Sequence, residues 1–140
     1  MTVKSGRNRS RSNSFKVHWQ GELKDYVTAL AWSPTGDCLA VSSSSGEVVL
    51  WTDAGLVSLL PDKSDYAIDC LGFSADGTYL AAAGQQGEVF VWSILALDRS
   101  PTVLQNPYCW IDRLVWHRMQ PWLAFGAGNQ IQVWDAIGAQ

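Results

Sequence analysis

Hydrophobic and polar positions along this chain repeat in three successive blocks of about 41 residues. The blocks run from Tyr26 to Trp51, from Ala67 to Trp92 and from Trp110 to Trp134. Their closing tryptophans lie 41 and then 42 residues apart, and most apolar, turn and glycine positions agree between the first two blocks. Such self-similarity at a fixed interval indicates an internal structural repeat.

Each block has the pattern of short antiparallel strands, which is clearest in the first. Apolar residues alternate with small or polar ones in Val27–Trp32, and this alternation predicts a strand. Residues 34–37, Pro-Thr-Gly-Asp, predict a tight turn that leads into a second short strand at Cys38–Val41. After a polar loop, a third strand is expected at Val48–Trp51 and a fourth at Leu56–Leu60.

The second block repeats this order, and the third repeats it in part. Strands are expected at Ile68–Phe73, Tyr79–Ala83, Val89–Trp92 and Thr102–Gln105. The third block stops six residues after Trp134, before any fourth strand. No segment shows the sustained 3.6-residue period of an amphipathic helix, so the pattern predicts an all-β protein.

A repeat of 40–45 residues with four strands and a closing tryptophan is typical of a β-propeller blade. The chain resembles the WD-repeat family over about residues 15–136, in its Ser-Pro-Thr-Gly-Asp and Ser-Ala-Asp-Gly-Thr turns and its Val-Val-Leu-Trp, Val-Phe-Val-Trp and Gln-Val-Trp-Asp endings. The resemblance implies β-propeller blades of four antiparallel strands, about three of them present. Their expected bounds are about 24–60, 65–105 and 108–140.

Three blades are too few to close a ring, because propellers have 4–8 blades. We therefore expect residues 15–140 to be a partial WD-repeat propeller, an N-terminal fragment of a larger ring. Closure by self-association and a lone wedge are the alternatives. The segment Phe15–Trp19 resembles a further strand before the first block, and residues 1–14 are expected to form a disordered basic leader.

The chain departs from the family in its polar residues. The dipeptide that names the family survives only as Trp134-Asp135, and the Gly-His pair expected before each first strand is missing. The family's buried polar network therefore cannot form, and apolar stacking of sheets must carry the stability. We expect the five recurring tryptophans to pack between blades: Trp32, Trp51, Trp92, Trp116 and Trp134.

Charge and composition disfavour several other classes of protein. The net charge is −3, but five of the ten basic residues lie in the first 16 positions and none of the 13 acidic residues precedes Glu22. The rest of the chain is acidic, which disfavours nucleic acid as a partner. There is no stretch of 18 apolar residues, so no membrane span is expected. The three widely spaced cysteines disfavour disulfides and metal sites and favour a cytoplasmic location.

No motif in the sequence points to catalysis, a cofactor or a metal. The leading hypothesis is a non-catalytic scaffold that displays propeller loops to protein partners. By resemblance, the candidate contact residues lie on the narrow face around the central channel: Tyr26, Thr28, Asp69, Trp110 and Asp112. Aromatic residues beside carboxylates suit a basic partner. One alternative is a propeller enzyme with Asp69 and Asp112 in a channel completed by missing blades, and another is a nucleic-acid binder that uses the basic leader.

Overall fold

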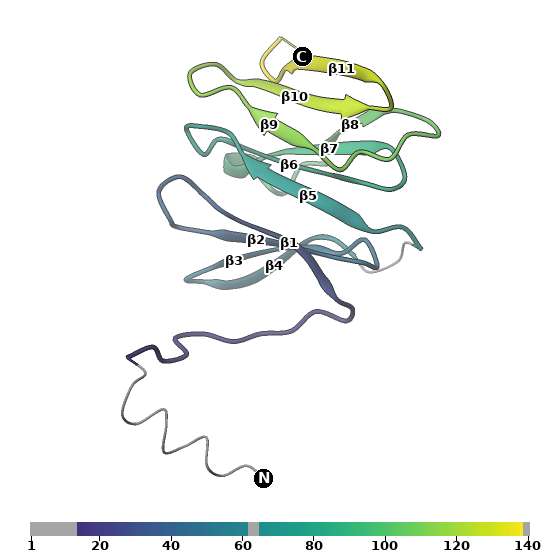
Figure 1. Cartoon of the computed structure of the whole chain (residues 1–140). Coiled ribbons are helices and arrows are strands. Elements are labelled where there is room, and N and C mark those ends of the chain that lie inside the picture. Colours follow the sequence, from purple (N-terminus) through teal and green to yellow (C-terminus); the bar gives the residue numbers. More distant parts are fainter. Residues whose placement is uncertain (1–13, 62–64, 139–140) are drawn as a thin grey trace.

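Three β-sheets stack one behind another along the chain (Figure 1). The structure is a computed structural model, and it describes residues 14–61 and 65–138. The leader expected at residues 1–14 therefore lies, except for its last residue, outside the described residues. We call the sheets one, two and three in chain order, and together they form an unclosed propeller wedge.

Sheet one consists of four antiparallel strands in chain order: β1 (Val27–Trp32), β2 (Leu39–Ser43), β3 (Val48–Thr52) and β4 (Gly55–Leu60). The turn between β1 and β2 requires a left-handed backbone, which Gly36 supplies at a φ of +80°. The four strands expected from the sequence are present, with ends that differ by one or two residues.

Sheet two has the same order of strands. They are β5 (Ile68–Phe73), β6 (Tyr79–Gly84), β7 (Glu88–Ser93) and β8 (Thr102–Gln105). A single turn of 3₁₀ helix, η1 (Ile94–Ala96), connects β7 to β8. The repeat seen in the sequence is therefore a repeat of whole sheets.

Sheet three has three strands, β9 (Leu114–Trp116), β10 (Trp122–Ala127) and β11 (Gln130–Asp135), in the order β11-β10-β9. The described residues contain no fourth strand after β11, as the sequence predicts. In the turn after β9, His117 takes the place of the serine found in the other blocks. Its Nδ1 accepts two backbone N–H groups of the turn at 3.0 Å, so this histidine supports the turn.

Sheet two lies between the other two sheets and contributes to two separate cores. Leu80 and Ala82 of β6 pack in the core shared with sheet one, together with Leu50. Their neighbours Ala81 and Ala83 pack in the core shared with sheet three. All four β6 residues have no exposed surface, which explains a strand that is apolar on both faces.

The expectation that all five recurring tryptophans pack between blades is confirmed for Trp92 and Trp116 and wrong for Trp32 and Trp51, while Trp134 lines a groove between sheets two and three and is only partly covered. Trp92 and Trp116 are buried, with 3% and 8% of their surface exposed. Trp32 is 59% exposed, because it lies with the half-buried Trp51 on the face of sheet one that points away from sheet two. Trp134 is 40% exposed, because it lies at the open edge of sheet three.

The strand expected at Phe15–Trp19 is not formed. Phe15 and Val17 are 86% and 75% exposed. A strand is held by ladder hydrogen bonds to a neighbouring strand, whereas Trp19 is held by stacking on Trp51, with ring centroids 4.7 Å apart. The segment therefore runs along the outer side of sheet one without joining a sheet (Figure 1).

Candidate protein-interaction surface

The residues that precede the first strand of each sheet lie at one common end of the wedge. β1 packs beside β5, and β5 packs beside β9. Equivalent backbone bonds fix these residues: the carbonyl of Tyr26 accepts the N–H of Ser44 at 2.9 Å, and the carbonyl of Ala67 accepts the N–H of Gln85 at 3.0 Å. Side chains from different sheets are therefore neighbours at this end.

Trp110 and Asp69 are joined across the boundary between sheets two and three. The indole Nε1–H of Trp110 donates to Asp69 Oδ2 at 2.7 Å, while 58% of the Trp110 surface stays exposed. Asp69 lies near the start of the second block and Trp110 begins the third, so the stacking of the sheets brings them together. A charged acceptor strengthens a hydrogen bond, and this one fixes the orientation of an exposed aromatic ring.

Two carboxylates, those of Asp69 and Asp112, act on the thiol of Cys70. Burial, the carboxylate of Asp69 and that of Asp112 raise the pKa of Cys70 to about 12, although its hydrogen bond to Ala83 opposes the shift. The thiol is within 3.5 Å of the carbonyl oxygen of Ala83 and 3.6 Å of that of Ile111. Cys70 is therefore a protonated, unreactive thiol at neutral pH, and negative charge gathers around it.

Tyr108 is fully exposed and has a φ of +65°, the one positive value among described residues other than glycine. It is the third residue of a turn that the N–H of Cys109 closes on the carbonyl of Asn106 at 3.2 Å. This backbone costs a side-chain-bearing residue roughly 1–2 kcal/mol, and such strain is concentrated at functional sites. Tyr108 is not among the contact residues predicted from the sequence, although Pro107 at the second turn position is a signal for this type of turn.

Two further tyrosines lie at the same end. Tyr26 is 83% exposed and Tyr66 is 49% exposed. Tyr66 borders a cavity of about 220 Å³ between sheets one and two, with Leu60 and Phe90 in its walls. We define the aromatic–acidic face by its six residues: Tyr26, Tyr66, Asp69, Tyr108, Trp110 and Asp112.

Thr28, a fifth predicted contact residue, has a structural position. Its hydroxyl donates to the carbonyl of Ile68 and is 2.8 Å from the hydroxyl of Ser42. These bonds join sheet one to sheet two, and Thr28 itself is half-buried. Because its hydroxyl is already used between sheets, Thr28 is excluded from the aromatic–acidic face, while the other four predicted contact residues belong to it.

The described residues offer neither a metal site nor a membrane-spanning helix. Within residues 14–61 and 65–138, no group of three or more His, Cys, Asp or Glu side chains is arranged to hold a metal ion. The part of the chain that the structure describes contains no helix long and apolar enough to cross a membrane. Exposed aromatic rings and carboxylates are therefore the chemistry that this end of the wedge offers.

Comparison with known proteins agrees with the fold. The family model described as WD domain, G-beta repeat (WD40) matches residues 10–52 and 56–93. A chain of the mitotic checkpoint complex is similar with a TM-score of 0.74 and 22% identity, over 86% of this chain and 38% of that one. The crystal structure of the RRP9 WD40 repeats is similar with a TM-score of 0.72 and 14% sequence identity, and the match covers 84% of this chain and 38% of that one. The Cps50 (Swd1) β-propeller domain of Myceliophteria thermophila is similar with a TM-score of 0.66 and 20% sequence identity, and the match covers 83% of this chain and 37% of that one. No curated protein matches the sequence.

These comparisons define both the family and the extent of the match. The chain spans 38% of the first solved propeller structure that it resembles. Identities this low show the fold alone, which is a set of propeller blades that does not close. The family model covers more than half of the chain, including strands β1 to β3 of sheet one and β5 to β7 of sheet two. This chain therefore belongs to the WD40 repeat family.

Proposed function

We propose that this chain is a non-catalytic interaction module that binds a basic segment of a partner protein on the aromatic–acidic face. The observation that carries the proposal is the hydrogen bond between Trp110 and Asp69, which holds an exposed indole ring beside a carboxylate. A lysine or arginine side chain can form a cation–π interaction with the face of such a ring and an ion pair with the nearby carboxylate.

Each interaction that this surface offers contributes only a small binding free energy, so a stable complex needs several of them. A cation over an exposed aromatic ring contributes roughly 0.5–1 kcal/mol, and a surface ion pair about 0–1 kcal/mol. The ring of Trp110 offers a cation–π contact and the carboxylate of Asp112 an ion pair, and the exposed rings of Tyr108 and Tyr26 extend the contact area. Several basic residues in one partner segment would therefore be needed for a stable complex.

The comparisons support an interaction role at the level of the family. One similar structure is a chain of the mitotic checkpoint complex, so a propeller of this fold takes part in an assembly of proteins. Rigid sheets position loops well for binding. The three cysteines are free thiols, which supports the further proposal of a reducing, cytoplasmic location.

An enzyme with Asp69 and Asp112 as catalytic carboxylates is less favoured by the geometry. One oxygen of Asp69 is already engaged by the indole N–H of Trp110. The thiol of Cys70, on which both carboxylates act, is kept protonated by burial and by their charge, which raise its pKa. Both features fit a fixed recognition surface better than a site that exchanges protons.

The experiment compares two double variants in binding a fluorescein-labelled octapeptide that contains four arginines. Trp110→Ala with Asp112→Ala removes an aromatic ring and a charge from the aromatic–acidic face. Trp122→Ala with Asp53→Ala removes the same side-chain types from exposed positions elsewhere. Fluorescence anisotropy at low and high salt measures the affinity.

We expect the first double variant to bind about tenfold more weakly, since central aromatic anchors each contribute more than about 1 kcal/mol. The control variant should bind like the original chain, and salt should weaken both. If the two double variants bind the peptide equally well, the assignment of this face is wrong.

A further inference from the structure

A groove lies at the end of the wedge opposite the aromatic–acidic face, where β5 and β9 end. Strand β5 begins beside that face at Ile68 and ends at Phe73, and β9 ends at Trp116. The groove between the ends of these two strands has a volume of about 340 Å³. The residues that line it lie between positions 72 and 118, so both walls come from the interior of the chain. We call it the β5–β9 groove.

The walls of the β5–β9 groove are apolar. Phe73 lines it on the side of sheet two, and Leu114 and Val115 line it on the side of sheet three. Val115 is 65% exposed. Gly72 leaves room between the walls, because a Cβ at this position would lie 3.0 Å from Leu114 Cδ1. An apolar side chain of a partner would therefore lose contact with water on entering this groove, which stabilises the complex.

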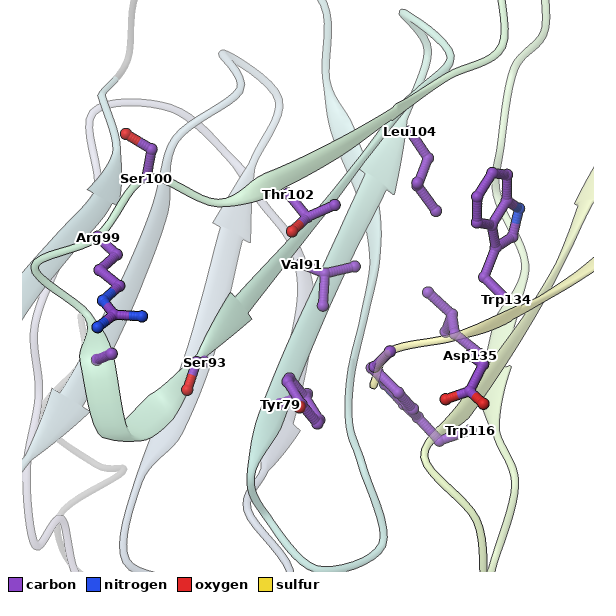
Figure 2. A pocket seen from close by; sticks show the side chains of 13 residues that line it. Tyr79, Val91, Ser93, Arg99, Ser100, Thr102, Leu104, Trp116, Trp134 and Asp135 are labelled. Atoms are coloured by element: carbon purple, nitrogen blue, oxygen red, sulfur yellow. The ribbon is translucent and has the colours of Figure 1, made fainter. Parts of the chain in front are cut away.

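Two contacts between sheets two and three hold this groove in shape. The indole N–H of Trp116 donates to the carbonyl of Gly72 at 2.9 Å, which ties β9 to β5. The ring of Trp116 also stacks on that of Tyr79 in β6, with centroids 5.9 Å apart. Figure 2 shows these two rings facing each other across the boundary between the sheets. A groove that is already formed needs little ordering when a ligand binds.

The turn after β9 brings a positive charge to the groove at a place where the third block departs from the repeat. Residues 117–120 are His-Arg-Met-Gln, where the other blocks have Ser-Pro-Thr-Gly and Ser-Ala-Asp-Gly. In those blocks the hydroxyls of Ser33 and Ser74 accept a backbone N–H of their turns. His117 Nδ1 does the same in the third block. The turn is therefore held without the side chain of Arg118.

Arg118 is the single Arg, Lys, Asp or Glu residue among those that line the groove. It is exposed and forms no hydrogen bond or ion pair within residues 14–61 and 65–138. Asp76 lines an adjoining hollow that Arg118 also borders. Its carboxylate accepts the N–H of Thr78 at 3.0 Å and the hydroxyl of Ser74 at 2.9 Å, which lower its pKa and hold it in its own turn. No carboxylate of the described residues therefore pairs with Arg118.

These groups fit a carboxylate that has an apolar neighbour. A guanidinium group binds a carboxylate through two parallel N–H···O bonds. His117 also lines the groove, and because its Nδ1 is an acceptor, its Nε2 carries a proton and is a further donor. An extended segment in which glutamate and leucine alternate supplies both a carboxylate for these donors and an apolar side chain for the walls.

We propose that the β5–β9 groove binds an acidic segment of a partner protein, with a carboxylate on Arg118 and a neighbouring apolar side chain between Phe73 and Val115. This contact lies at the opposite end of the wedge from the aromatic–acidic face and does not depend on it. With both surfaces occupied, the chain would link two partners of opposite charge.

The probe is a synthetic peptide with blocked ends and the sequence Gly-Ser-Glu-Leu-Glu-Leu-Ser-Gly. It is titrated into the isotope-labelled 140-residue chain, and NMR spectra follow the backbone amides and the indole N–H of Trp116. We expect saturable shifts of that indole signal and of the amides of Gly72 and residues 117–120. A peptide with Gln in place of Glu should bind about fivefold more weakly, as expected for loss of an exposed ion pair. A peptide with Ser in place of Leu should give no saturable shifts, because nothing apolar then enters the groove.

Charge reversal tests the role of Arg118. Arg118→Glu should bind the glutamate peptide about tenfold more weakly, because a repulsion of similar size replaces the attraction. The same variant should prefer a peptide with Lys in place of Glu. Arg99→Glu, a matched reversal at an exposed position outside the groove, should change neither affinity. Ala75→Glu places a carboxylate on the groove wall beside Arg118 and should weaken binding of the glutamate peptide by competing for the guanidinium group. Unchanged signals from β6 show that each variant is folded.

Three results would overturn the proposal. The first is the absence of saturable shifts at Gly72, Trp116 and residues 117–120. The second is equal affinity of the original chain and Arg118→Glu for the glutamate peptide. The third is a set of shifts centred on Arg99, since a different cation is then the binding group. None of these results bears on the aromatic–acidic face, which is tested with an arginine peptide.

Discussion

The contrast between Trp92 and Trp134 yields a quantitative prediction, because the same residue of the repeat has two environments. A tryptophan buries roughly 150–250 Å², which at about 25 cal/mol per Å² corresponds to about 4–6 kcal/mol. Measured truncations of buried aromatics to alanine cost about 3–5 kcal/mol. With 3% of its surface exposed, Trp92 should lie in that range. Trp134, 40% exposed, retains about three-fifths of the burial, so Trp134→Ala should cost about 2–3 kcal/mol.

Urea unfolding followed by circular dichroism at 25 °C measures these differences as changes in the free energy of unfolding. Trp32→Ala serves as the control, because it removes the same side chain from a position that is 59% exposed. The expected order of destabilisation is Trp92, then Trp134, then Trp32. If Trp134→Ala costs as much as Trp92→Ala, the open edge of sheet three is not the reason for its exposure, and the reasoning fails.

Three further predictions test particular residues. Tyr108→Gly should raise the free energy of unfolding by about 1 kcal/mol in a thermal or urea melt, because glycine adopts the φ of +65° without strain. Gly84→Ala should destabilise by at least about 3 kcal/mol, since its Cβ would lie 2.0 Å from the carbonyl oxygen of Ala67, whereas Gly126→Ala, with nothing within 4 Å, should not. Folding raises the pKa of Cys70 from 9.0 to about 12, so its contribution to the free energy of unfolding is fully present below pH 9.0 and is lost as the pH rises toward about 12. Cys70→Ala should therefore reduce the fall in the free energy of unfolding between pH 9.0 and about 12, as measured by urea melts.

The strands could be predicted wherever side chains alternate clearly between two environments. Val27–Trp32 and Ile68–Phe73 begin and end where the pattern predicts. The polar pair Ser42 and Ser43 looks like part of a loop in the sequence, but both residues are fully buried in β2. The reason lies in another sheet, because the Ser42 hydroxyl bonds to the carbonyl of Ile68. A contact of this kind is visible only once the sheets are stacked.

The aromatic–acidic face could be predicted in part, and the interval of the repeat is the reason. Asp69 is the third residue of the second block and Trp110 the first residue of the third, so the repeat places both at the same end of neighbouring sheets. Thr28 follows the same rule but points between the sheets, and periodicity does not distinguish that direction from exposure to solvent. The backbone strain of Tyr108 depends on one local turn and leaves no periodic signal.

The central position of sheet two has a consequence for how the molecule opens. Because sheet two alone contributes to both cores, each outer sheet is fastened by a single interface, and the two interfaces meet on opposite sides of β6. In such a linear arrangement, stability is transmitted only between nearest neighbours. Fluctuations should therefore begin at the two ends of the stack and travel inward. Amide exchange would then be slowest in β6, the last strand to lose both of its supports.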